Sequence, residues 1–62
     1  MRVQWLREDP GKPAKKITRA ELEPAAYQHF SRWISEIDRF VVGSGGEYTH
    51  NLVTYRFTIV AD

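Results

Sequence analysis

The chain has 62 residues, a formal net charge of +1 and no cysteine. This length leaves room for a single hydrophobic core, and the lack of cysteine excludes disulfides, thiolate metal sites and cysteine nucleophiles. No apolar run approaches the roughly 20 residues that a membrane-spanning helix needs. With 42% hydrophobic and 27% charged residues, the composition predicts one folded domain over residues 1–62. A disulfide-free fold of this size is expected in the cytoplasm.

The small net charge conceals an uneven distribution. Residues 1–19 contain six Lys or Arg and two Asp or Glu (net +4), whereas residues 20–62 contain three and six (net −3). A basic segment of this kind is typical either of an arm that binds anionic partners or of a solvated loop. The charge distribution therefore keeps nucleic acid among the candidate partners.

The N-terminal segment is predicted to be a strand followed by a loop. Val3 and Trp5 alternate with polar residues over 2–7, which is the period-2 pattern of a strand with one buried face. Residues 8–16 are predicted to form a basic turn or loop, because they contain Asp-Pro-Gly at 9–11, a sequence with strong turn-forming chemistry.

The start of a helix is marked by capping signals. Thr18 and Glu21 have the spacing of a capping box, in which each side chain bonds a free backbone N–H of the other residue. Ile17 and Leu22 occupy the two positions of a hydrophobic staple. Pro24 lacks a backbone N–H and would interrupt a helix that began at Thr18. We therefore expect one short turn before Pro24 and a main helix that has Pro24 as its first residue.

The main helix has the clearest pattern in the chain. At 100° per residue, its apolar residues fall within an arc of about 140°, and its polar residues lie on the opposite side. Gly43 is expected to end this helix, because glycine commonly follows the last helical turn. The apolar arc consists of Leu22, Ala26, Tyr27, Phe30, Trp33, Ile34, Ile37, Phe40 and Val41.

The C-terminal part is predicted to be a connector followed by extended chain. Residues 43–46 have the sequence Gly-Ser-Gly-Gly and are expected to form a flexible Gly-rich connector. Apolar and polar residues alternate over 53–59, as in a strand with one buried face. A bulge or a short hairpin is expected near His50. Whether residues 14–17 and 47–51 form separate strands is left open.

Together, these elements predict an α+β fold. One amphipathic helix packs on a small, mainly antiparallel sheet of two or three strands, in the order β-α-β or β-α-β-β. The core is rich in aromatic residues, each of which buries roughly 150–250 Å², so that a short chain can fold without disulfides. The expected core residues are Val3, Trp5, Ile17, Leu22, Ala26, Phe30, Trp33, Ile34, Ile37, Val41, Val53, Tyr55, Phe57 and Ile59.

No motif indicates catalysis, a cofactor or a bound metal. A phosphate-binding glycine loop follows a strand and precedes a helix, whereas residues 43–46 follow the predicted helix. His29 and His50 lack neighbours at the spacing of metal ligands. Glu36 and Asp38 lie about 200° apart on a helix and cannot act as an acid–base pair. We therefore expect no enzymatic activity, no small-molecule substrate, no cofactor and no metal.

Protein–protein contact is the function that the sequence favours. A sheet of two or three strands leaves unpaired edges, which natural proteins protect or pair. We expect a non-enzymatic interaction or regulatory module, such as those encoded by phages and plasmids. It would work as a homodimer or dock on a protein target as an inhibitor or adaptor. The expected interface residues are Tyr48, Thr54, Arg56 and Thr58.

Nucleic-acid binding is the alternative function, and no membrane contact is expected. The residues that would carry it are the basic side chains of the N-terminal loop and the residues after it. Against it, the sequence pI of about 8.1 is lower than the value above about 9 that is typical of nucleic-acid-binding domains. The basic residues concerned are Lys12, Lys15, Lys16 and Arg19.

Overall fold

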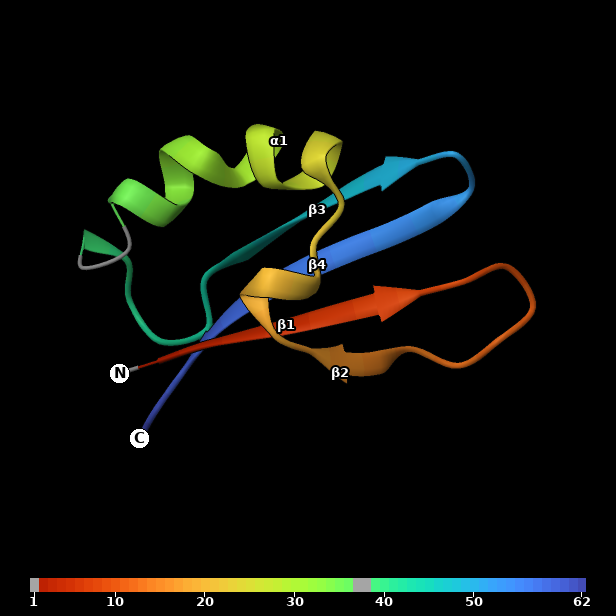
Figure 1. Cartoon of the computed structure of the whole chain (residues 1–62). Coiled ribbons are helices and arrows are strands. Elements are labelled where there is room, and N and C mark those ends of the chain that lie inside the picture. Colours follow the sequence, from red (N-terminus) through yellow and green to blue (C-terminus); the bar gives the residue numbers. More distant parts are fainter. Residues whose placement is uncertain (1, 37–38) are drawn as a thin grey trace.

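A computed structural model of the chain describes residues 2–36 and 39–62 and shows an α+β fold (Figure 1). The four strands form one antiparallel sheet in the order β2-β1-β4-β3. Helix α1 and the short 3₁₀ turn η1 lie on the same side of this sheet (Figure 1). The elements, in chain order, are β1 (Arg2–Glu8), β2 (Lys15–Ile17), η1 (Arg19–Glu21), α1 (Pro24–Ser35), β3 (Gly45–His50) and β4 (Val53–Val60).

The sheet differs from the predicted one in the number and order of its strands. It has four strands rather than two or three, and the chain order is β-β-α-β-β. β2 is absent from both predicted orders, whereas β3 is present in the order β-α-β-β and absent from β-α-β. Both are edge strands, and their sequences carry weak strand signals. β2 has only three residues, too few for alternation to be recognised, and β3 begins with two glycines, which are depleted in strands.

The loop between β1 and β2 contains the expected turn. The Lys12 N–H donates to the Asp9 carbonyl oxygen at 3.1 Å, and Gly11 has a φ of +72°. A positive φ at this position is typical of a type II turn, which favours glycine there. Because β1 reaches Glu8 and β2, a strand that the sequence left open, begins at Lys15, the loop covers residues 9–14 rather than 8–16.

The predicted start of the helical region is confirmed. The Glu21 carboxylate accepts hydrogen bonds from the Thr18 N–H at 3.2 Å and from the Thr18 hydroxyl at 3.1 Å. The Glu21 N–H donates in turn to the Thr18 carbonyl at 3.0 Å. η1 makes a single turn, and α1 then begins at Pro24, where the missing N–H of proline costs no helical hydrogen bond. The Tyr27 N–H donates to the Glu23 carbonyl at 2.8 Å.

The predicted end of the helix is wrong. α1 ends at Ser35 rather than close to Gly43, and the Glu36 N–H bonds the Trp33 carbonyl three residues earlier at 3.1 Å, a tighter turn that is common at helix ends. The chain must turn back early because Gly43 already pairs with β4. Within the described residues, no helix is both long and apolar enough to cross a membrane.

The core lies between α1 and one face of the sheet, as predicted. Its buried members are Trp5, Leu22, Ala26, Phe30, Tyr55, Phe57 and Ile59. Further predicted members pack around it half-buried: Val3, Ile17, Ile34 and Val53.

Three predicted core residues have a different outcome. Val41 was expected in the core as part of a longer helix, but it follows the end of α1 and is 71% exposed. Trp33 lies at the margin of the core with its ring 6.2 Å from that of Phe57. Ile37, like Asp38, lies outside the described residues.

Two glycines that were expected in a flexible connector belong to β3. Gly45 is opposite Thr58 and Gly46 is opposite Phe57 in the β3–β4 register. A Cβ atom at Gly45 would overlap the Phe57 carbonyl oxygen, whereas one at Gly46 would lie 3.1 Å from the edge of the Phe57 ring. The absence of a side chain at Gly45 therefore allows the two backbones to approach, and only Gly43 and Ser44 of the predicted connector lie outside β3.

The bend near His50 is a β-hairpin with a two-residue loop. Asn51 and Leu52 connect β3 to β4, and both have positive φ values, +51° and +68°. This is the pattern of a type I′ turn, which suits the twist of a hairpin and favours Asn-Gly. Leu52 stands where glycine is preferred, and its side chain is 78% exposed. The turn therefore contains backbone strain that no burial of the leucine side chain offsets.

Gly45→Ala should lower the free energy of unfolding by about 1–3 kcal/mol, because the new methyl group forces β3 away from β4. The measurement is the urea midpoint followed by circular dichroism. Gly46→Ala is the matched control and should cost less, since the ring edge that its methyl group meets can shift. Equal losses in the two variants would contradict the close-approach argument.

Leu52→Gly should raise the free energy of unfolding by about 1 kcal/mol, because glycine adopts a positive φ without the steric cost that an L-residue has there. The same urea titration measures the effect. Leu52→Ala removes most of the exposed side chain but keeps the Cβ atom, so it should give no comparable gain. A gain of the same size in both variants would show that backbone strain is not the cause.

Candidate interaction surface

The sheet has two chemically different faces. The residues of β4 that point toward α1 are apolar, whereas the alternate residues point away from it. In the described parts of the chain, no helix or strand packs on this second face (Figure 1), which we call the open face. It consists of Arg2, Gln4, Leu6 and Glu8 of β1, Lys16 of β2, Gly45, Glu47 and Thr49 of β3, and Thr54, Arg56, Thr58 and Val60 of β4.

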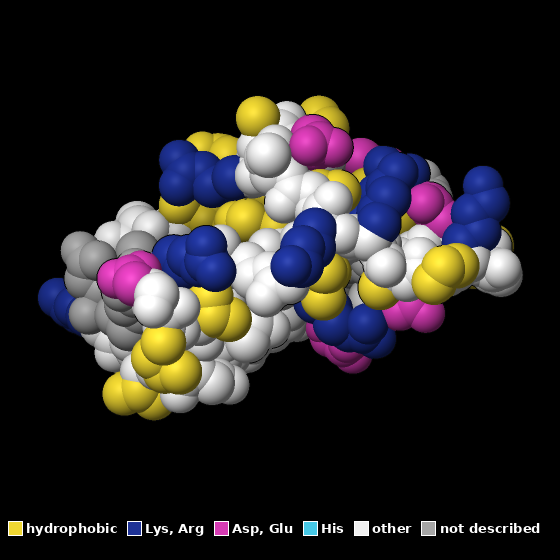
Figure 2. Space-filling model, turned by 90° about the horizontal axis from the view of Figure 1, so that it is seen from below, with side chains coloured by type: hydrophobic (Ala, Val, Ile, Leu, Met, Phe, Trp, Pro, Cys, Tyr) yellow, Lys and Arg dark blue, Asp and Glu magenta, His cyan; other side chains and the backbone are white. Residues whose placement is uncertain are grey.

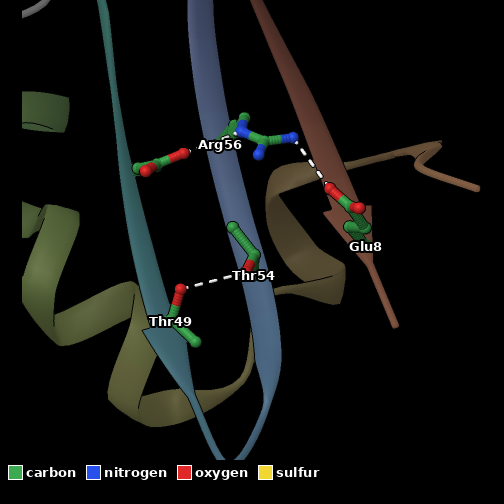
Figure 3. Close-up of polar contacts among 5 residues, drawn as sticks. Glu8, Thr49, Thr54 and Arg56 are labelled. Carbon is green, nitrogen blue, oxygen red and sulfur yellow. Dashed lines mark hydrogen bonds and ion pairs between the residues drawn. The ribbon is translucent and has the colours of Figure 1, made fainter. Parts of the chain in front are cut away.

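Arg56 bridges three strands at the centre of the open face (Figure 3). Its Nη1 atom lies 2.9 Å from Glu8 Oε1 on β1, and its Nε atom lies 2.8 Å from Glu47 Oε2 on β3. Two hydrogen bonds raise the pKa of Arg56 above its usual value. The larger effect comes from Glu47 and the next from Glu8. Because all three side chains are more than 40% exposed, solvent screens both pairs and they contribute little to stability. One Arg and two Glu leave this cluster with a net charge of −1.

Hydroxyl groups continue this surface toward the hairpin. The Thr49 and Thr54 hydroxyls face each other across β3 and β4 and form a hydrogen bond of 2.9 Å (Figure 3). Thr58 lies further along β4, opposite Gln4 of β1. The centre of the open face is therefore polar, but its charges and two of its hydroxyls already have partners within the chain.

The structure brings together three of the four residues predicted for the interface. Thr54, Arg56 and Thr58 all lie on the open face. Tyr48 lies on the opposite face, where its ring stacks on His29 of α1 with the ring centroids 4.3 Å apart. The reason is the register: Tyr48 pairs with the buried Tyr55, and paired residues of an antiparallel sheet share a face.

The residues predicted for nucleic-acid binding point in different directions. Lys16 lies on the open face opposite Leu6, whereas Lys15 is opposite Arg7 on the other face. The Arg19 guanidinium lies 6.0 Å from the Tyr27 ring, and Lys12 is in the β1–β2 loop. In the face shown in Figure 2, Lys and Arg side chains are dispersed among acidic and apolar ones rather than gathered into a single patch.

β3 forms one edge of the sheet. The Ile59 N–H donates to the Ser44 carbonyl and the Gly43 N–H donates to the Ile59 carbonyl, each at 2.8 Å. Because backbone groups alternate in direction along an antiparallel strand, Gly45, Glu47 and Thr49 direct their N–H and C=O groups away from β4. No strand within residues 2–36 or 39–62 pairs with this outer edge. It is open to another chain.

A titratable cluster at the hairpin end of the core was not predicted. The Tyr55 side chain is fully buried, and burial raises the pKa of its phenol, as does the nearby Glu23 carboxylate. Glu23 Oε2 lies 3.6 Å from His50 Nδ1, and the Arg7 guanidinium lies 5.7 Å from the Tyr55 ring. These residues are distant in sequence, and only the β1–β4 register together with the position of α1 brings them together.

Neither histidine has the surroundings of a metal ligand. His29 and His50 both stack near the Tyr48 ring, with centroid separations of 4.3 and 6.1 Å. Within the described residues, no group of three His, Cys, Asp or Glu side chains is arranged to hold a metal ion. Their contacts are ring packing against Tyr48, His29 from α1 and His50 from β3.

Comparisons with protein-family models, with curated proteins and with solved structures found no match to this chain. The interpretation of the surface therefore depends on the chemistry of its own residues.

Tyr55→Phe should flatten the loss of stability at alkaline pH. The folded chain keeps the phenol proton at pH values where the unfolded chain, with an ordinary pKa of about 10, has lost it. The stabilising contribution is therefore complete below about pH 10 and disappears as the pH rises through the raised pKa. Urea midpoints between pH 8 and 11.5 measure the slope. The exposed Tyr27→Phe variant should keep the wild-type slope, and an unchanged slope in Tyr55→Phe would contradict the assignment.

Proposed function

We propose that this chain is a small non-enzymatic interaction module that binds another protein chain through its sheet, with a second copy of itself as the first partner. The observation that supports this function is that one face of the four-stranded sheet and the outer edge of β3 are uncovered in the described residues. Natural proteins usually protect or pair an exposed strand edge of this kind.

The chemistry of the open face favours a protein partner. Arg56 is paired with both Glu8 and Glu47 within the chain, so a second chain that covers it leaves no unpaired cation, although the cluster keeps a net charge of −1. The Thr49–Thr54 hydroxyl pair is likewise already satisfied. Desolvating this surface therefore costs less than desolvating free charges and hydroxyls.

The edge of β3 supplies the directional part of the contact. The backbone groups of Gly45, Glu47 and Thr49 point outward, and edge-to-edge pairing would satisfy them with main-chain hydrogen bonds. Glu47 is the only charged residue of β3, and its carboxylate already accepts a hydrogen bond from Arg56. A standard interface takes roughly 800 Å² from each partner, a modest part of the 4439 Å² that the chain exposes.

Nucleic-acid binding through Lys12, Lys15, Lys16 and Arg19 is the competing function. It would require these side chains to act on one surface, because a nucleic-acid backbone is contacted along a continuous basic groove or face. In the structure Lys15 and Lys16 point to opposite faces of the sheet. The sheet contact is therefore the better supported proposal.

Self-association should be lost in Thr58→Arg, which adds an unpaired charge to the open face. Sedimentation equilibrium should give the wild type a mass about twice its 7.2 kDa and the variant the monomer mass. Ser31→Arg introduces the same side chain on the exposed side of α1 and should leave the dimer intact.

The sedimentation experiment is repeated at two salt concentrations with and without a pool of DNA and RNA fragments. The expected result is a dimer whose sedimentation mass does not change when nucleic acid is added. A strict monomer in the absence of nucleic acid, or a monomer that binds the pool in a salt-sensitive manner, contradicts the proposal.

A further inference from the structure

The sheet is also incomplete at the edge opposite β3, where β2 covers only part of β1. β2 pairs only with Trp5, Leu6 and Arg7 of β1. After Ile17, the last residue of β2, the chain leaves the sheet and enters η1. Among the described residues, no strand lies beside the first part of β1, from Arg2 to Gln4. This edge is distinct from the outer edge of β3.

The backbone of Val3 points outward at this edge. The Ile59 N–H and C=O groups both bond the chain next to β3, so the neighbouring Thr58 and Val60 direct theirs toward β1. Their partners on β1, Gln4 and Arg2, must therefore face β4. Val3 lies between these two residues and directs its own N–H and C=O away from β4, toward the edge of the sheet. The described strands supply no partner for these groups there.

A groove adjoins Val3 at this position. It has a volume of about 200 Å³, and its lining residues are Val3, Trp5, Ile17 and Val60, which are apolar, Arg2 and Lys16, which are cationic, and Gln4. The groove thus combines an unpaired stretch of strand, an aliphatic surface and positive charge.

A third cation lies on the other side of Val3. Arg19 lines a smaller hollow of about 90 Å³ together with Val3, Trp5 and Ile34. In the described part of the chain neither Lys16 nor Arg19 forms an ion pair.

Two carboxylates of this region have other interactions. Glu21 accepts two hydrogen bonds from Thr18, and Asp62 interacts electrostatically with Arg2. The surroundings of Val3 therefore favour a negatively charged ligand that offers carboxylates to Lys16 and Arg19.

We propose that this edge of β1 binds an extended acidic peptide segment of a partner protein, which adds to the sheet as a short strand in line with β2. Its backbone would bond the N–H and C=O of Val3, and its carboxylates would meet Lys16 and Arg19. The inference shares one premise with the proposed function, namely that the sheet is the contact surface. It differs in assigning a second partner to a different edge of the sheet.

The geometry favours a peptide over a nucleic acid. A strand edge with an outward N–H and C=O pair matches the main chain of a peptide, and the aliphatic lining from Val3, Ile17 and Val60 matches alternate apolar side chains. A nucleic-acid backbone would instead require cations spaced along a longer track with aromatic stacking surfaces. Trp5, the aromatic residue among those that line the groove, is only 6% exposed and offers little ring surface for stacking.

The test uses ¹⁵N-labelled protein at 0.15 M salt and a capped peptide of sequence Glu-Val-Glu-Val-Glu. The amide signals of Val3, Lys16 and Ile17 should shift on titration. The Lys16→Glu/Arg19→Glu double variant should bind at least tenfold more weakly. The matched control is Lys12→Glu/Lys15→Glu, which makes the same change in net charge outside the groove and should weaken binding less than threefold.

Two further probes separate strand addition from simple charge attraction. A peptide that is N-methylated at its central glutamate should bind at least fivefold more weakly. A Lys-Val-Lys-Val-Lys peptide should not bind. Equal affinity for the methylated peptide, equal weakening in both double variants, or no shift with the acidic peptide at 5 mM would each overturn the inference. So would an oligothymidylate that binds the same residues more tightly.

The result is separable from that of the sedimentation experiment. Peptide binding with no self-association would leave this inference standing while removing the proposed homodimer. A dimer that shows no shift with the acidic peptide would overturn this inference alone. Amide spectra of each variant, compared with the wild type before titration, ensure that loss of binding reports the site and not the fold.

Discussion

Pairing between the two ends of the chain is the contact on which the structure depends. β1 and β4 pair over seven residues, from Arg2↔Val60 to Glu8↔Thr54, and they form the centre of the sheet. β2 and β3 each pair with only one of these central strands, and an isolated two-stranded hairpin is marginal in water. Both hairpins therefore depend on a contact between residues about fifty positions apart, whose closure entropy must be offset by burial of the core.

An aromatic triangle provides much of that burial. The rings of Trp5 on β1, Phe30 on α1 and Phe57 on β4 lie 5.4 to 5.5 Å from one another, and edge-to-face or tilted pairs at this distance add to the gain from burial. Within the described residues there is a single α-helix, and it covers one face of the sheet. The other face is left open as a consequence.

Much of this fold could be predicted from the sequence where one local rule acted alone. The Thr18–Glu21 pair and Pro24 predicted the start of α1, and alternation over 53–59 predicted the strand that became β4. These signals are local because each arises from backbone sterics or from a side chain that bonds its own neighbourhood.

The remainder was decided by tertiary contacts. The apolar arc favoured a helix that reached Val41, but the pairing of Gly43 with Ile59 required the chain to turn back earlier. Gly45 and Gly46 resembled a linker, because the close backbone approach that favours glycine at β3 depends on the position of Phe57. The face on which Tyr48 lies depended on a register that period-2 patterning alone does not define, so only part of the interface could be inferred.

The two open edges of the sheet differ in chemistry, and this difference favours different partners at each. The outer edge of β3 carries glycines and one carboxylate that is paired with Arg56, which suits a chain of the same composition. The free edge of β1 is surrounded by Arg2, Lys16 and Arg19, which suits an acidic strand and disfavours a second copy of this edge through charge repulsion. Two strand spacings, roughly 10 Å, separate β1 from β3. The two proposed partners would add on opposite sides of the sheet, the second copy next to β3 and the acidic peptide next to β1, so neither proposal excludes the other.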